Sequence, residues 1–183
     1  MLLNETKIIL DLCGGTGAWS KPYKDAGYDV RLITLLENDV RDYIPPENVY
    51  GVLAAPPCTE FAVSGARWWK DKGHEPLLKG LEIVGACCRI ILFSNPKFWC
   101  VENPVGRLRR FIGEPAMYFD PCDYGDPWTK KTTLWGNFNV PEKNPVTPVG
   151  KNPIHHCPPG PKRQEFRSTT PPGFAKAFYE SNR

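Results

Sequence analysis

The sequence has no run of 18 apolar residues, no CxxC pair and no visible internal repeat. The first of these absences excludes a membrane-spanning helix. The amino-terminal residues also lack the basic start, apolar stretch and small-residue cleavage site of a secretory signal, so we expect a cytoplasmic protein. In that compartment the seven cysteines, which are odd in number, are predicted to remain reduced thiols.

A metal site is not predicted either. The string His155-His156-Cys157 offers three donor side chains. No second pair of ligands stands at the spacing that zinc sites use, however. We therefore expect no bound metal.

The sequence contains enough for one folded domain. Its 183 residues are 41% hydrophobic and 12% aromatic, which excludes disorder and leaves too little chain for two ordinary domains. Its 20 prolines are about twice the usual share, and nine of them lie after residue 140. Residues 129–183 carry nine Lys and Arg against three Asp and Glu. We interpret this basic tail as a surface that meets a polyanion, and a solvated loop region is the alternative.

Strand and helix signals alternate along the chain. Strands are expected at residues 7–12, 29–34, 49–54, 98–102, 119–122 and 132–138, and helices at residues 18–26, 75–94 and 173–181. The helix at residues 75–94 is apolar on most faces and should be largely buried. The alternation predicts an α/β fold, with a mostly parallel sheet and helices on both of its faces.

The first expected strand ends in a glycine-rich turn, DLCGGTG at residues 11–17. In an open parallel sheet, ligands bind beyond the carboxyl ends of the strands, and glycine lets the backbone approach a nucleotide-like ligand. The turn is not the GxGxxG fingerprint. An NAD site would also need an acid at the end of the second strand, where Thr34 or Leu35 stands and the nearest acids are Glu37 and Asp39. A simple tight connection is the alternative interpretation.

Two further strands end in side chains that could carry chemistry. Two prolines follow the strand at residues 49–54, and their stiff backbone presents Cys58 at the carboxyl edge of the sheet. Glu102 closes another strand, where partial burial should raise the pKa of its carboxyl group. Taken alone, Cys58 could be a structural thiol and Glu102 a turn cap. Together with the glycine turn, on one sheet edge, they predict a catalytic site.

These strings resemble those of the cytosine-5 DNA methyltransferases. DLCGGTG is similar to the family's DLFAGxGG, and PCTEFAVSG at residues 57–65 to its PCQxFSxSG, which carries the nucleophile. ENP at residues 102–104 is similar to ENV, and YGDPWTKKT at residues 124–132 to YGVPQxRxR. The closing string at residues 168–172 matches GNSVP only loosely. The order and approximate spacing hold from about residue 7 to residue 138.

The resemblance implies a Rossmann-like fold that uses S-adenosylmethionine to methylate carbon-5 of cytosine in DNA. Residues 1–138 would form the catalytic core, and residues 139–183 a proline-rich basic tail with a short C-terminal helix. Cys58 would add to carbon-6 of the base. Glu102 would bond nitrogen-3 and the exocyclic amine, and Lys130 would supply a positive charge. The target base must be flipped or single-stranded for its ring face to be reached.

The resemblance also implies a set of cofactor-binding residues, located in the glycine turn, at the ends of the next strands and before the nucleophile. These are Asp11, Leu12, Cys13, Gly15, Thr16, Gly17, Thr34, Asp39, Val40 and Pro56. Two of them depart from the family. Thr34 stands where the family has an acidic ribose ligand, and Cys13 where it has an adenine-stacking Phe. These changes predict weak cofactor affinity or a modified role for the cofactor.

About 30 residues separate residue 138 from residue 168, and the family's target recognition domain would not fit there. We therefore expect relaxed or very short sequence recognition, with phosphate contacts from the basic tail and a partner protein as a possible source of specificity. Such a compact version suits a phage or mobile genetic element, acting in a bacterium or an infected host cell.

Three alternatives remain open. An amino-group DNA methyltransferase would need an amide or carboxylate before the prolines and an aromatic residue after them, where Ala55 and Cys58 stand. A non-catalytic homologue could keep the fold and bind DNA or a partner chain. The same chemistry could also act on RNA or on a free cytosine nucleotide, for which a recognition domain is unnecessary.

Overall fold

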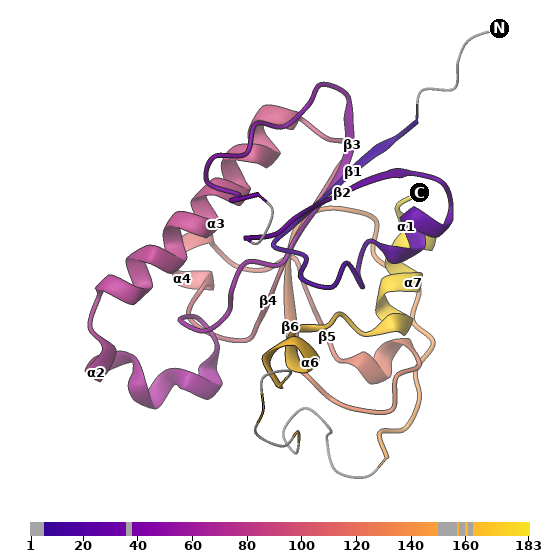
Figure 1. Cartoon of the computed structure of the whole chain (residues 1–183). Coiled ribbons are helices and arrows are strands. Elements are labelled where there is room, and N and C mark those ends of the chain that lie inside the picture. Colours follow the sequence, from indigo (N-terminus) through magenta and orange to yellow (C-terminus); the bar gives the residue numbers. More distant parts are fainter. Residues whose placement is uncertain (1–5, 36–37, 150–156, 158–159, 161–162) are drawn as a thin grey trace, which may run out of the picture.

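The computed structural model describes residues 6–35, 38–149, 157, 160 and 163–183 (Figure 1). Glu37, His155 and His156 lie outside the described residues. None of the helices in the described part of the chain combines the length and the apolar character needed to cross a membrane.

One sheet organises the molecule, with strand order β2-β1-β3-β4-β6-β5. The strands are β1 (Ile8–Leu12), β2 (Asp29–Ile33), β3 (Val49–Ala54), β4 (Phe98–Pro104), β5 (Met117–Phe119) and β6 (Thr132–Asn137). The strands β2, β1, β3 and β4 pair in parallel, whereas β6 is antiparallel to both β4 and β5. This is a Rossmann-like α/β arrangement, and the sheet is mostly but not fully parallel.

Helices cover both faces of the sheet, as the sequence predicts (Figure 1). They are α1 (Lys21–Asp25), α2 (Trp69–Lys72), α3 (Glu75–Ser94), α4 (Arg109–Ile112), α6 (Arg163–Ser168) and α7 (Pro172–Ser181), with 3-10 helices η1 (Val63–Trp68) and η2 (Pro121–Tyr124). The buried side of α3, with Val84 and Ile90, packs on one face against Leu10 and Val52. Helices α1 and α7 lie on the other face. Strands covered on both faces explain the nearly continuous apolar sequences of β1 and β3.

Several predicted boundaries are wrong. The strand expected at residues 119–122 is Met117–Phe119, and the 3-10 helix η2 follows it, because Pro121 has no N–H to donate to a neighbouring strand. Helix α1 begins at Lys21 rather than residue 18, because the chain is still turning at Gly17, which has a φ of 70°. The short helices η1, α2, α4 and α6 were not predicted. The remaining elements agree with the expected ranges to within two residues.

The last helix belongs to the core although it lies in the basic tail. Phe174 and Phe178 of α7 are fully buried, and both rings contact Trp19, with centroid distances of 6.0 and 5.4 Å. Asp126 Oδ2 accepts a hydrogen bond from the Gly173 N–H over 3.0 Å at the start of α7. The division of the chain at residue 138 stays a prediction, and the packing adds that α7 completes the second face of the sheet.

Candidate active site

The carboxyl ends of β1, β3 and β4 lie at one edge of the sheet, because these strands run parallel. This edge carries the glycine turn after β1, the Cys58 loop after β3, and Glu102 in the last half of β4. The Asn103 Nδ2 donates a hydrogen bond to the Pro56 carbonyl over 2.9 Å and ties β4 to the loop. The Cys58 carbonyl accepts the N–H of Phe61 over 2.9 Å, so Cys58 stands at the start of a closed turn.

The Cys58 thiol is half-buried and lies in the electrostatic field of three charged side chains. Burial raises the pKa of the thiol, and the negative charge of Glu102 raises it further. The positive charges of Lys130 and Arg167 lower this pKa. The structure therefore brings together the three residues that were expected to be catalytic, and it adds Arg167, which was not predicted.

Glu102 lies opposite Leu134 of β6 in the antiparallel pair. Burial raises the pKa of its carboxyl group, and the charge of Lys130 partly offsets this effect. Within the described residues, no hydrogen bond or ion pair engages the Glu102 carboxylate. A carboxyl group of this kind can donate a proton to a bound base and take it back, as general acid–base chemistry requires.

Lys130 is held through both its backbone and its side chain. Its N–H donates to Asp120 Oδ1 over 2.9 Å, and its Nζ donates to the Arg167 carbonyl over 3.0 Å. Asp120 is itself fixed by a capping box with Asp123 at the start of η2. The bond to the Arg167 carbonyl holds α6 beside the site.

The glycine turn is built around a buried carboxylate. Asp11 is fully buried, and its Oδ2 accepts a hydrogen bond from the Ser20 hydroxyl over 2.5 Å. Burial raises the pKa of Asp11 to about 6. A Cβ on Gly14 would lie 2.2 Å from the Asp11 carboxylate, so this position accepts only glycine. Gly14 was not among the residues predicted to bind the cofactor.

The remaining residues of the turn divide into buried and open ones. The side chain of Leu12 is fully buried in the core, and its carbonyl accepts the N–H of Ala55 over 2.9 Å. Cys13 has a φ of 58° and packs against the core next to α3. Gly15 has a φ of 57°, and a Cβ there would meet nothing within 4 Å. Gly15 and the exposed Thr16 therefore leave backbone open to a nucleotide-like ligand.

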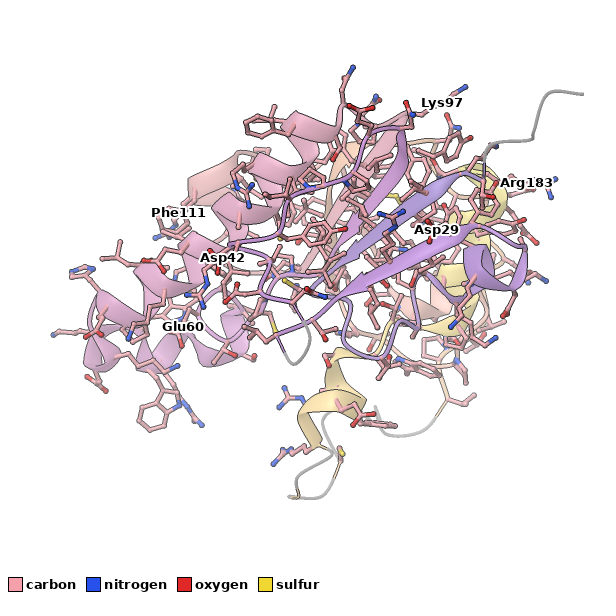
Figure 2. The ribbon with its side chains drawn as sticks, turned by 45° about the horizontal axis from the view of Figure 1, so that its top comes forward. Asp29, Asp42, Glu60, Lys97, Phe111 and Arg183 are labelled. Atoms are coloured by element: carbon pink, nitrogen blue, oxygen red, sulfur yellow. The ribbon has the colours of Figure 1, made fainter. Side chains whose placement is uncertain are left out.

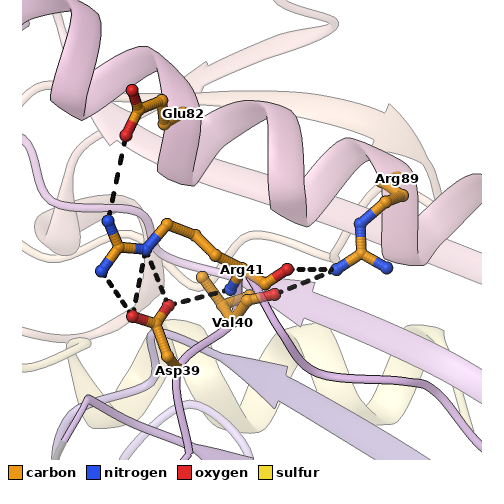
Figure 3. Close-up of polar contacts among 5 residues, drawn as sticks. All are labelled: Asp39, Val40, Arg41, Glu82 and Arg89. Carbon is orange, nitrogen blue, oxygen red and sulfur yellow. Dashed lines mark hydrogen bonds and ion pairs between the residues drawn. The ribbon is translucent and has the colours of Figure 1, made fainter.

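Asp39, one of the expected cofactor-binding residues, is engaged by a neighbouring arginine (Figure 3). Asp39 accepts hydrogen bonds from the backbone N–H and the guanidinium of Arg41, and these bonds lower the pKa of Asp39 to about 2. Arg41 also approaches Glu82 of α3 at 3.9 Å. Arg89 donates to the carbonyls of Val40 and Arg41 over 3.2 and 3.0 Å. This network holds residues 38–43 against α3.

The other expected cofactor-binding residues lie around this network. Thr34 is half-buried at the end of β2, and its carbonyl accepts the N–H of Asn38 over 2.8 Å. Val40 is buried, with 4% of its surface exposed. Gly17 donates its N–H to the Gly14 carbonyl over 3.0 Å and closes the turn. The cofactor-binding roles of all these residues stay predictions. Among the described residues, no cluster of three His, Cys, Asp or Glu side chains could hold a metal ion.

Comparison with known proteins shows related methyltransferases. No family model matches the chain. A probable DNA (cytosine-5)-methyltransferase of Frog virus 3 is 29% identical over 144 residues, covering 73% of this chain and 67% of the viral protein. The type II methyltransferase M.DdeI of Desulfomicrobium norvegicum is 24% identical over 170 residues, covering 69% of this chain and 39% of that enzyme.

The chain also aligns with the solved structure of a protein that is named as a methyltransferase. A putative DNA modification methyltransferase encoded within an E. coli prophage aligns with a TM-score of 0.48 at 17% identity, over 78% of this chain and 53% of that protein. The viral relative fits the expected link to phage and mobile elements. The sequence matches confirm the resemblance that the motifs indicated: this chain is similar to a protein named as a probable DNA (cytosine-5)-methyltransferase and to one named as a type II methyltransferase.

Proposed function

We propose that this chain is an enzyme that transfers a methyl group from S-adenosylmethionine to carbon-5 of cytosine in DNA. The observation that carries the proposal is the location of the half-buried Cys58 thiol in the common field of Glu102, Lys130 and Arg167, at the carboxyl edge of the sheet. The names of the two curated relatives support it. The chain spans only 39% of the length of the bacterial relative. That this chain alone carries out the methyl transfer is therefore proposed here and does not follow from the match.

The chemistry begins with Cys58, because carbon-5 of cytosine is a poor nucleophile until a thiolate adds to carbon-6. Cys58 releases its proton to solvent and forms a bond to carbon-6, while ring electrons move to nitrogen-3. Glu102 donates a proton to nitrogen-3, so no negative charge remains on the ring. Burial raises the pKa of Glu102 and increases the fraction that carries this proton.

S-adenosylmethionine would supply an electrophilic methyl group: carbon-5 bonds to the methyl carbon while the bond from that carbon to the sulfonium sulfur breaks, and its electron pair stays on the sulfur of the departing S-adenosylhomocysteine. The carbon-5 proton then leaves to solvent, and the electron pair of that C–H bond restores the ring double bond. Cys58 departs as a thiolate, and Glu102 takes back its proton from nitrogen-3. Lys130 provides a positive charge near the thiolate in both the addition and the elimination.

The glycine turn fits a bound cofactor in part. Open backbone at Gly15 allows close approach of a ligand, whereas Asp39 is engaged by Arg41 and Thr34 has no charge for a ribose hydroxyl. We infer that Gly15, Thr16 and Gly17 line the cofactor site through their backbone, and that the affinity for the cofactor is weak.

DNA is the proposed substrate because it matches the charge of the tail. Arg163 and Arg167 of α6 lie in the basic tail, and Lys130 contacts this helix. These groups are suited to contact phosphates on either side of the target, and they read no base sequence. The target cytosine has to leave the base stack for Cys58 to reach its ring face.

The test measures transfer of a tritiated methyl group to four substrates: duplex DNA, single-stranded DNA, RNA and dCMP. We expect labelled DNA whose hydrolysate contains 5-methylcytosine. Label on the exocyclic amine would overturn the carbon-5 assignment. Labelling of RNA or dCMP in preference to DNA would instead move the same chemistry to another substrate.

The nucleophile is tested with Cys58→Ser, which should lose at least about three orders of magnitude of activity. Cys88→Ser, a change at another half-buried cysteine, is the matched control and should remain active. An oligonucleotide containing 5-fluorocytosine should trap a covalent adduct with the wild-type chain and none with Cys58→Ser. Activity of Cys58→Ser equal to that of wild type would refute the covalent mechanism.

A second candidate is a non-catalytic homologue that binds DNA or a partner chain. The observation that favours it is the engagement of Asp39 by Arg41 together with the uncharged Thr34. Calorimetry distinguishes the two candidates. Measurable binding of S-adenosylmethionine supports the enzyme, whereas tight DNA binding without any cofactor binding supports the binding protein.

A further inference from the structure

The segment that follows the Cys58 loop carries an exposed aromatic surface with positive charge. Trp68 closes η1 with 52% of its surface exposed, and the Arg67 guanidinium lies over its ring at 5.0 Å from the centroid. Residues 63–72 contain three basic residues, Arg67, Lys70 and Lys72, and one acid, Asp71. Aromatic rings next to Lys and Arg are a surface on which nucleic acid bases stack while phosphates are contacted.

The base of this segment is anchored. The neighbouring Trp69 is half-buried, and the Arg107 guanidinium lies over its ring at 4.3 Å. Arg107 Nε donates to the Glu60 carbonyl over 2.6 Å, and Lys72 Nζ contacts the Glu60 carboxylate at 2.7 Å. Figure 2 shows Glu60 beside the helices of this segment. The anchored Trp69 thus leaves Trp68 as the outward ring of the pair.

The segment is tied to the candidate active site at two points. The Cys58 carbonyl accepts the N–H groups of Phe61 and Ala62, directly before η1. The Val63 N–H, at the start of η1, donates to the Val105 carbonyl over 2.9 Å, just beyond the end of β4. The start of η1 is therefore joined both to the Cys58 loop and to the end of the strand that carries Glu102.

We propose that Trp68, with Arg67 over its ring, is a stacking platform for a DNA base that neighbours the target cytosine. The inference rests on the proposed function for its choice of DNA as the occupant. The charge of the segment is complementary to phosphate, and the flat exposed ring matches the face of an unstacked base. A flipped cytosine leaves its neighbours without one stacking partner, and Trp68 provides a replacement surface.

Stacking of this kind is tolerant of base identity, because every base has a π-face. The platform would therefore add affinity and position the strand without specifying a long target sequence. This agrees with a chain in which no recognition domain is expected between residues 138 and 168. Trp68 is a positioning residue in this scheme, since it contacts a neighbour of the reacting base.

The test compares Trp68→Ala and Trp68→Phe with wild type, using fluorescence anisotropy of a labelled single-stranded oligonucleotide. We expect Trp68→Ala to lose about tenfold in affinity, and Trp68→Phe to lose less because it keeps a ring. Phe93→Ala is the matched control, because Phe93 is 78% exposed and lies on α3 at its far end. Figure 2 shows Lys97, just after that end, on the side of the molecule opposite α6.

A second arm places a single abasic site at each position beside the target cytosine. For wild type, one of these should weaken binding, and for Trp68→Ala that same change should have little further effect. Equal affinity of Trp68→Ala and wild type, or equal losses for Trp68→Ala and Phe93→Ala, would overturn the inference. The binding readout needs no methyl transfer, so a chain that binds through Trp68 but methylates nothing would refute the proposed function and leave the platform intact.

Discussion

The two halves of the carboxyl edge differ in whether their carboxylates already have hydrogen-bond partners. In the target half, which holds Cys58, Glu102 and Lys130, no hydrogen bond or ion pair engages the Glu102 carboxylate within the described residues, and the Lys130 charge acts on it from a distance. In the cofactor half, formed by residues 11–17 and 34–40, the two carboxylates that the structure describes are already engaged. Asp11 accepts the Ser20 hydroxyl, and Asp39 accepts the Arg41 guanidinium.

This difference indicates which part of the reaction tolerates change. Carbon–sulfur bond formation needs a thiol and a proton donor at fixed positions, and the target half keeps both. Cofactor binding is distributed over many weak contacts, so the loss of a few of them lowers affinity without abolishing the chemistry. The comparison predicts large effects of substitutions in the target half and smaller ones in the cofactor half.

The largest effect is expected for Glu102→Gln, which keeps the shape of the side chain and removes its proton. Without a donor at nitrogen-3, charge remains on the ring during the addition of Cys58, and the rate of methyl transfer should fall about a thousandfold. The rate is measured with saturating DNA and tritiated S-adenosylmethionine. DNA affinity should change little, because Glu102 acts on the base after it has entered the site.

The pH dependence sharpens this prediction. Burial raises the pKa of the Glu102 carboxyl group, so its protonated form is lost only above the range ordinary for glutamate. The wild-type rate should therefore decline on the alkaline side through loss of this proton, and Glu102→Gln should not show that decline. A Glu102→Gln variant with an unchanged profile would assign the proton donor to another group.

The second effect is a stability difference in the cofactor half, produced by Asp11→Asn. Burial raises the pKa of Asp11 to about 6, above its value in the unfolded chain. The native state therefore binds more protons than the unfolded state between about pH 4 and pH 6. Protonated Asp11 therefore stabilises the native state at low pH, and this stabilisation is lost as the pH rises through about 6. At pH 7 the buried charge of Asp11 lowers the free energy of unfolding by about 3 kcal/mol.

Asp11→Asn should remove this cost. The free energy of unfolding of the variant, measured by urea denaturation, should exceed that of wild type by about 3 kcal/mol at pH 7, and the difference should vanish near pH 4. Asp25→Asn, at an exposed carboxylate of α1, controls for the loss of one negative charge. A difference that is constant across this pH range would show that Asp11 is not the responsible group.

Much of the fold could be predicted because the local signals were strong. The strand at Val49–Ala54 and the helix at Glu75–Ser94 have the boundaries that the sequence indicates. The strand is an apolar run that stops at two prolines, and the helix is a long apolar stretch that begins after Gly73 and His74. Such sharp boundaries allow few other assignments of secondary structure. Helix α6 was missed because RQEFRS has no apolar periodicity, and the structure holds its end through the Lys130 contact.

The candidate site could be predicted where chemistry selects the residue type. Cys58 and Glu102 stand at strand ends, and parallel strands bring such ends together. Gly14 and Arg167 were missed for two different reasons. The need for glycine at residue 14 arises from the Asp11 carboxylate folding back on it, and Arg167 reaches the site across 37 residues of sequence from Lys130. Neither contact has a local sequence pattern.

A smaller effect is expected for Thr34→Glu, which places an acid at the end of β2. A carboxylate there could accept hydrogen bonds from ribose hydroxyl groups, and we expect about a tenfold gain in affinity for S-adenosylmethionine. Calorimetry of the purified chain measures it. Thr34→Gln is the matched control, since it adds the same length without the charge. Equal affinity of Thr34→Glu and wild type would show that this position does not face the ribose.

The smallest effect is expected for Arg167→Ala, at the point where the tail meets the target half. The positive charge of Arg167 lowers the pKa of the Cys58 thiol, so its removal should raise that pKa and decrease the thiolate fraction. Alkylation of Cys58 by iodoacetamide at pH 7.5, followed by mass spectrometry, should slow by about threefold. Arg163→Ala, on the same helix, is the control and should leave the rate unchanged. If both variants react as wild type does, the tail acts on DNA alone, and the target half is complete without it.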